Sequence, residues 1–194
     1  AALDALTSGD NNTAVGSGAG TAINSGGNST FIGAGSGQTN QTGGSNTGVG
    51  YWSLLSSNAA ANTSVGATAD MWNNTGTYNT SLGFAALEGV NGNSHSFNTA
   101  VGAKALEAVT TGDYNVSLGY TSGDNITTGS GNVTIGKADV SSATADDQLS
   151  ISDGEDGSVV WMTGDSSANI VIAGTTHSAG GQLTTTGKAF VMGF

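Results

Sequence analysis

The chain has 194 residues, and only 9% of them are charged, against roughly 25% in an ordinary globular protein. The formal net charge is −11 with three basic residues in all, which argues against nucleic acid or an anionic membrane as a partner, because both attract basic surfaces. The absence of cysteine excludes disulfides and thiolate metal sites, and no apolar run is long enough for membrane insertion as a helix.

The composition favours a thin repetitive fold over a conventional globular core. Glycine occurs 33 times and proline never. A missing proline suits a backbone in which nearly every N–H joins a ladder hydrogen bond. Disordered chains, in contrast, usually carry high charge and proline. We therefore expect an ordered chain whose core is one side chain wide.

Residues 1–12 match the second half of a repeat that recurs farther along the chain, for example at residues 105–115. The sequence thus starts in mid-repeat. We expect an N-terminal part of the repeat array to precede it.

A pentad recurs eight times: a polar residue, a Thr-like residue, a small residue, a branched apolar residue and glycine. Its closing glycines are spaced by 17, 17, 16, 17, 19, 17 and 17 residues. Another glycine stands three residues before six of the eight copies, where we expect a tight turn with positive φ. Between pentad and turn lies a second short apolar stretch, as at Ala105–Leu106. The pentads occupy residues 12–16, 29–33, 46–50, 62–66, 79–83, 98–102, 115–119 and 132–136.

This period predicts strand, turn, strand and turn in about 17 residues, which is too short for a helical repeat or a propeller blade. We predict an all-β fold: a parallel β-solenoid, or β-roll, of about eight 17-residue coils stacked at the strand spacing of about 4.8 Å. A single coil of this size buries little apolar surface. We therefore expect a homotrimer closed around a three-fold axis.

Side chains alternate in direction along a strand, so the pentad has two faces. We predict that its fourth residues form the internal core stack and that the Thr-like second residues face inward with them. The third residues, small in seven of eight copies, are expected to form a subunit interface. The leading Asn residues form either a ladder of side-chain amides or solvated turns. The predicted core stack comprises Val15, Ile32, Val49, Val65, Leu82, Val101, Leu118 and Ile135.

The pentad is lost after about Val140. We assign residues 1–140 to the repeat shaft and residues 141–194 to a small, β-rich, trimeric C-terminal tip. Such a tip would cap the open end of the solenoid, as repeat arrays require.

The pentad resembles the head repeat of trimeric autotransporter adhesins, where a similar motif ending in Ile-Gly marks each coil of a left-handed parallel β-roll. The longer form at residues 98–113 is more similar to tail-fibre proteins of bacteriophages. The segments 146–151, 161–165 and 187–194 are similar to the terminal segments of such fibres. The resemblance implies a homotrimeric fibre with a host-attachment tip.

We expect no catalytic residues and no cofactor, so the chain is not predicted to be an enzyme. It has two histidines, and no Ser-His-Asp arrangement can be assembled from them with any specificity. The acidic stretch with Asp153, Glu155 and Asp156 is a weak candidate for a hard cation, with a solvated turn as the alternative. We expect His95 to lie in a solvated loop. Four side chains off the core columns are weak candidates for receptor contact: Trp72, Tyr78, His95 and Phe97.

The leading functional prediction is a structural, adhesive fibre protein of a virion: a phage tail fibre that attaches to a host receptor. Its expected partners are copies of itself, a host cell-surface glycan or protein, and other virion proteins bound through the upstream part. The alternative is a bacterial surface adhesin of the trimeric autotransporter type. A polysaccharide-degrading tailspike would need carboxylates clustered in a groove. An ice-binding solenoid would need an exposed threonine array. The Thr column is predicted to face inward, which argues against this function.

Overall fold

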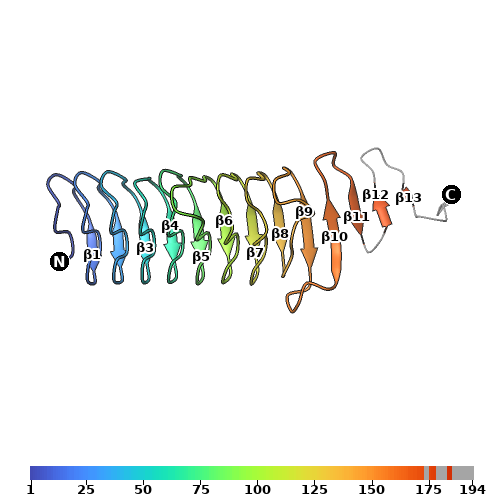
Figure 1. Cartoon of the computed structure of the whole chain (residues 1–194), viewed down its shortest axis with the longest axis horizontal. Coiled ribbons are helices and arrows are strands. Elements are labelled where there is room, and N and C mark those ends of the chain that lie inside the picture. The colour runs from blue at the N-terminus through green and yellow to red at the C-terminus, as the bar shows by residue number, and fades with distance from the viewer. Residues whose placement is uncertain (173–174, 178–182, 185–194) are drawn as a thin grey trace.

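The computed structural model describes residues 1–172, 175–177 and 183–184, and this part of the chain contains thirteen strands and no helix. The strands form one sheet in chain order (Figure 1). They are β1 (Thr13–Val15), β2 (Thr30–Ile32), β3 (Thr47–Val49), β4 (Thr63–Val65), β5 (Thr80–Leu82), β6 (Thr99–Val101), β7 (Val116–Leu118), β8 (Val133–Ile135), β9 (Leu149–Ser152), β10 (Val160–Gly164), β11 (Ile170–Ile172), β12 (Thr175–His177) and β13 (Leu183–Thr184).

The predicted parallel β-solenoid with a period near 17 residues is confirmed. Each pentad supplies one short strand, and equivalent residues of neighbouring coils pair directly, as Thr13 does with Thr30. The ladder goes one coil beyond the predicted end at Val140, because Leu149 of β9 pairs in parallel with Val133 of β8. From β9 onward the pairing becomes antiparallel, so β10 to β13 extend the same sheet as a meander.

The glycine that closes each pentad is required by the stacking of the coils. At Gly83 the backbone has a φ of 140°, a conformation that favours glycine. A Cβ at this position would lie 2.6 Å from the carbonyl carbon of Gly102 in the next coil. The close approach of successive backbones therefore excludes any side chain at this corner.

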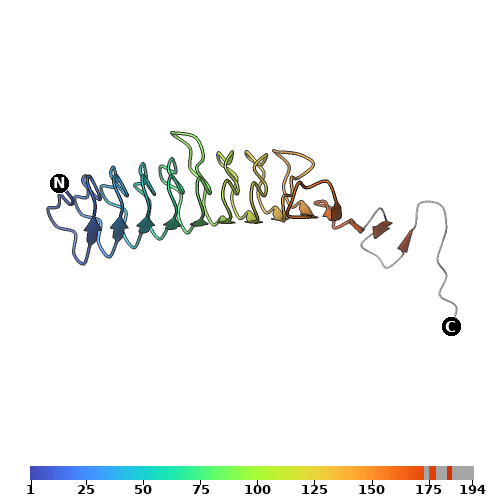
Figure 2. The same cartoon turned by 90° about the horizontal axis from the view of Figure 1, so that it is seen from below.

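The strands line one side of the rod and the loops line the other, as the turned view in Figure 2 shows. The 19-residue repeat between β5 and β6 accommodates its extra residues in a loop that rises on the side away from the strands. The rod therefore has one regular face, made of strands, and one irregular face.

The prediction of which pentad residues form the core is wrong. The third residues point into the coil, where seven of the eight are buried and Ala14 is partly buried, whereas the predicted core stack points outward. The interior is narrow, and the loop side fills it with large residues such as Leu54, Leu87 and Leu106, all 0% exposed. Little room is left opposite these side chains for more than a small residue on the strand. Phe31 is the one large third residue, and it fills space beside the glycines at 37 and 48.

The predicted subunit interface of small third residues is therefore also wrong, because these residues lie inside the coil. The Thr column was expected inside and lies outside: Thr63 and Thr80 are exposed. The residues wrongly assigned to the core are Val15, Ile32, Val49, Val65, Leu82, Val101, Leu118 and Ile135, each exposed or partly exposed.

The Asn column forms a buried ladder rather than solvated turns. Asn79 illustrates the pattern: its Nδ2 donates to the carbonyl of His95 at 2.8 Å, and its Oδ1 accepts the backbone N–H of Asn98 at 3.0 Å. Gln148 continues the ladder into β9, with its backbone N–H donating to Asn132 Oδ1 at 2.9 Å. Each amide satisfies turn groups that water cannot reach, so the ladder holds the turns in register from coil to coil.

Candidate functional site: the outward strand face

The outward side of the parallel strands β1 to β8 forms one regular surface. Its central column consists of the eight branched apolar residues of the pentads, with exposed fractions that reach 57% at Val15 and 50% at Leu118. The parallel register places these side chains one above another at about 4.8 Å. The column is therefore a continuous apolar stripe. We use the name strand face for this stripe together with the Thr column beside it.

Hydroxyl groups run parallel to this stripe. Six consecutive coils present threonine at the second pentad position, and the last two present valine. The parallel pairing aligns these threonines in a straight row. The row comprises Thr13, Thr30, Thr47, Thr63, Thr80 and Thr99.

Aromatic side chains stand at both edges of the strand face. Before the pentad, Tyr78, Phe97 and Tyr114 stack in successive coils, with ring centroids 5.3 Å and 4.7 Å apart and nearly parallel planes. After the pentad, Tyr51, Phe84 and Tyr120 stand in alternate coils and are also exposed. The candidate receptor contacts predicted from the sequence include Tyr78 and Phe97, and the structure adds Tyr114 to them as the third ring of one stack. All three rings directly precede the pentad Asn.

Trp72 lies on a different surface from the aromatic stack. It is partly buried and lines an open groove of about 620 Å³ together with Thr21, Gln38 and Leu55. The groove combines one indole ring with amide, hydroxyl and aliphatic groups. Receptor contact through Trp72 or the stacked rings stays a prediction.

His95 is buried, which contradicts its expected place in a solvated loop. It occupies the turn position that other coils fill with glycine, and its ring enters the interior. Its Nε2 lies 3.7 Å from Oδ1 of Asp70, with both side chains 0% exposed. Burial raises the pKa of Asp70 to about 7 and lowers the pKa of His95 to about 4. The pair is thus most stable with no net charge.

The candidate cation site at Asp153, Glu155 and Asp156 is a tight turn held by its own backbone. Oδ1 of Asp153 accepts the N–H groups of residues 155, 156 and 157 at 3.0 Å each, and Oδ2 accepts that of Val159 at 2.7 Å. These bonds lower the pKa of Asp153 to about 2. Both oxygens of Asp153 are therefore engaged by backbone donors, as in a solvated turn.

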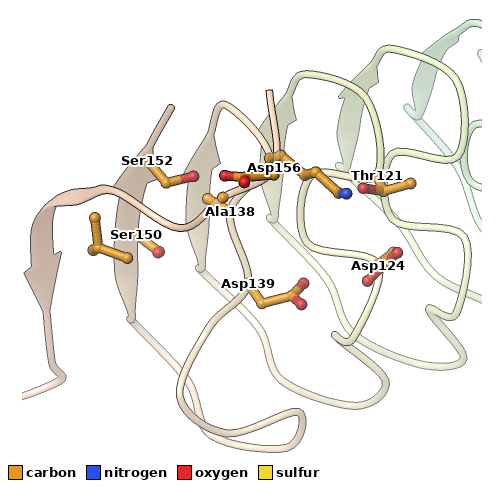
Figure 3. Close-up of a pocket in the computed structure, with 10 residues that line it drawn as sticks. Thr121, Asp124, Ala138, Asp139, Ser150, Ser152 and Asp156 are labelled. Atoms are coloured by element: carbon orange, nitrogen blue, oxygen red, sulfur yellow. The ribbon is translucent and has the colours of Figure 1, made fainter. Parts of the chain in front are cut away.

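A pocket of about 270 Å³ lies where the last coils meet the loop between β9 and β10 (Figure 3). Asp124 and Asp139 line it on one side, and Lys137, Asp156 and two buried serines line the rest. In Figure 3 the carboxylate of Asp139 points toward Asp124. Burial, followed by the charge of Asp139, raises the pKa of Asp124 to about 6.

Across the described residues, no group of three or more His, Cys, Asp or Glu side chains could hold a metal ion.

The described ranges contain no helix long and apolar enough to cross a bilayer. No protein-family model, curated protein or solved structure matches this chain.

Proposed function

We propose that this chain is a segment of a structural fibre that assembles as a homotrimer through the strand face, and that the fibre is a virion tail fibre which presents a host-attachment tip. The exposed apolar stripe carries this proposal. Single exposed aliphatic side chains are ordinary on protein surfaces. A stripe that continues over eight coils is typical of an interface, because each Å² removed from water stabilises the assembly by about 25 cal/mol.

The width of the strand face supports closure by three copies. Packed sheets lie about 10 Å apart, so each sheet in a three-sided prism would lie about 5 Å from the axis. An inner triangle of that size has sides of about 17 Å. From the residue before the pentad Asn to the residue after its Gly are six steps of about 3.3 Å, or about 20 Å at full extension. The face, which is at most about 20 Å wide, therefore matches one side of such a prism in scale.

The shape of the chain supports the fibre assignment. Coils succeed one another along a single axis, and the two ends of the described chain lie at opposite ends of the rod (Figure 1). A rod of this kind separates whatever stands at its two ends. A receptor-binding tip on a virion or on a bacterial surface needs this separation from its anchor.

The trimer is tested by mass and by one pair of matched variants. Light scattering should give three times the chain mass of 18.8 kDa. Leu82→Asp places a charge on the stripe, where the side chain is 48% exposed, and should yield folded single chains. Val90→Asp changes a residue that is 54% exposed outside the strand face, and should leave the trimer intact. A native chain with the mass of one subunit would refute the trimer.

The virion assignment is tested separately through the gene. A virion-attachment domain encoded upstream of residue 1 supports a tail fibre. A secretion signal upstream would refute the virion assignment and favour the bacterial adhesin.

The outward row of threonines favours one further candidate, a surface that orders water or ice. Six hydroxyls at about 4.8 Å intervals, flanked by branched apolar groups, form a regular flat array. Such a protein would act with its strand face in water, so it must not bury that face in a trimer. Thermal hysteresis in a freezing-point measurement on the native chain tests this function, and its absence there would exclude it.

A further inference from the structure

The two edges of the strand face differ in the side chains they carry. We call the residue before each pentad Asn the leading edge and the residue after each pentad Gly the trailing edge. From the third coil to the eighth, the leading edge is Ser45, Ala61, Tyr78, Phe97, Tyr114 and Gly131. Over the same coils the trailing edge is Tyr51, Ala67, Phe84, Ala103, Tyr120 and Lys137.

The leading edge holds its aromatic residues at a conformational cost. Tyr78, Phe97 and Tyr114 each have a φ of 60°, in the left-handed region that suits glycine and asparagine. Of the other five coils, three place Asn or Gly at this corner, and two place Ser or Ala. A strained position that retains a large exposed ring indicates that the ring has a role outside its own coil.

Cyclic symmetry about an axis parallel to the rod brings the two edges together. Rotation about such an axis leaves the height of every residue unchanged, so each coil faces the same coil of its neighbour. Each strand runs from the leading edge to the trailing edge, and the rotation carries this direction around the axis in one sense. The trailing edge of one copy therefore lies beside the leading edge of the next. We propose, on the basis of the proposed trimer, that these edges pair height for height and fix the axial register of the subunits.

The side chains at equal heights fit this pairing. In the fourth coil Ala61 would meet Ala67 of the neighbouring copy, so the edges can approach closely there. In the seventh coil Tyr114 would meet Tyr120 of the neighbouring copy, a pair of exposed rings that can pack edge to face.

Charges match at the eighth coil. Lys137 extends from the trailing edge near the ring of Tyr120, with 5.9 Å from Nζ to the ring centroid. It takes part in neither of the ion pairs found among the described residues. On the leading edge Gly131 leaves a space that Asp147 fills from the next coil, since a Cβ at Gly131 would overlap its Oδ1. The carboxylate of Asp147 thus lies at the height where Lys137 of the neighbouring copy arrives.

Cysteine cross-linking tests the pairing, because the natural chain has no cysteine. In the double variant Ala61→Cys/Ala67→Cys the two sites of one chain lie at opposite edges of the strand face, held apart by the extended strand β4 between them. A disulfide requires Cα atoms within about 7 Å, so only a bond between copies can form. Oxidation, or a short bismaleimide, should convert most of the protein to covalent trimers on a denaturing gel.

Three controls make the result specific. The mismatched double variant Ala61→Cys/Ala103→Cys, two coils out of register, should cross-link several-fold less. Each single-cysteine variant should stay uncross-linked, and a dimer band from either one would overturn the edge pairing. The reversal Lys137→Asp should lower the yield of covalent trimer in the matched variant, and adding Asp147→Lys should restore it.

Mass measurement separates the two proposals. A particle of three subunits without cross-links in the matched variant overturns the edge pairing and leaves the trimer standing. A particle of one subunit overturns both.

Discussion

The variants Asp70→Asn and His95→Gln should change the pH dependence of stability in opposite directions. Asp70 occupies a core position that the neighbouring coils fill with Leu54 and Leu87, and the ring of His95 lies against it. Burial is the largest cause of both pKa shifts, so each shift should persist when the partner is replaced by a neutral residue.

The sign for each group follows from its two pKa values. The pKa of Asp70 rises from 3.8 to about 7 on folding, so its stabilisation is complete below pH 3.8 and is lost as the pH rises through 7. The pKa of His95 falls from 6.5 to about 4, so stability is lost as the pH falls from 6.5 to 4. Each slope is about 1.4 kcal/mol per pH unit.

In the native chain the two slopes cancel between about pH 4 and pH 6.5. The folded pair holds one proton on Asp70, and the unfolded chain holds one proton on His95. The variants remove the cancellation. Between pH 4.5 and 6.5, Asp70→Asn should become more stable relative to the native chain by up to about 3 kcal/mol, and His95→Gln less stable by a similar amount.

Urea unfolding followed by circular dichroism at pH 4.5, 5.5 and 6.5, at one protein concentration, measures these differences. Subtraction of the native curve removes the contribution of the other carboxylates. Slopes of the same sign in both variants would show that burial does not control the pair. A native His95 ring that is charged at pH 6 by NMR would contradict the assigned position of the proton.

Three further predictions concern the coil itself. Asn115→Ala leaves buried turn groups of the adjoining coils without partners and should lower the free energy of unfolding by on the order of 2 kcal/mol in urea denaturation; an effect near zero would mean that the amide ladder is dispensable. Gly83→Ala forces a side chain into the backbone of the next coil and should destabilise the chain by more than about 1 kcal/mol in thermal unfolding, whereas Gly154→Ala, with no atom within 4 Å of the added Cβ, should be neutral. Backbone donors lower the pKa of Asp153 to about 2, so its carboxylate stabilises the turn fully above the ordinary pKa of 3.8, and this stabilisation is lost as the pH falls through 2. Amide exchange at residues 155–157 should accelerate in that range. Acceleration already at pH 4 would disprove the bonding.

The sequence pattern identified most residues of the strand face, but it did not show whether their side chains point into the coil or into solvent. The branched column and the Thr column share one face because the second and fourth residues of the pentad are two positions apart on the strand. Alternation alone cannot say which face is inside, since a shift by one residue exchanges the faces without changing the pattern. The decision depends on the loop side of the coil, where Leu54, Leu87 and Leu106 occupy the interior. Those residues belong to irregular segments, in which the direction of a side chain cannot be predicted from periodicity.

The burial of His95 shows the same limit. In sequence it belongs to the one long repeat, where an exposed loop is the ordinary expectation. In the structure the extra residues leave the coil earlier, so His95 returns to the turn position and its ring enters the core beside Asp70. Nothing local to either residue signals the contact, because the two are 25 positions apart and meet only through the stacking of coils.

By itself, the sequence determined the repeat, the parallel register and the corners that only glycine can occupy, because these depend on spacing and on backbone stereochemistry that every coil repeats. The tertiary structure alone decided which side chains meet water, because that depends on how much volume the opposite wall of each coil leaves unfilled. The strand face therefore became visible as an exposed apolar surface only once both walls of the coil were in place.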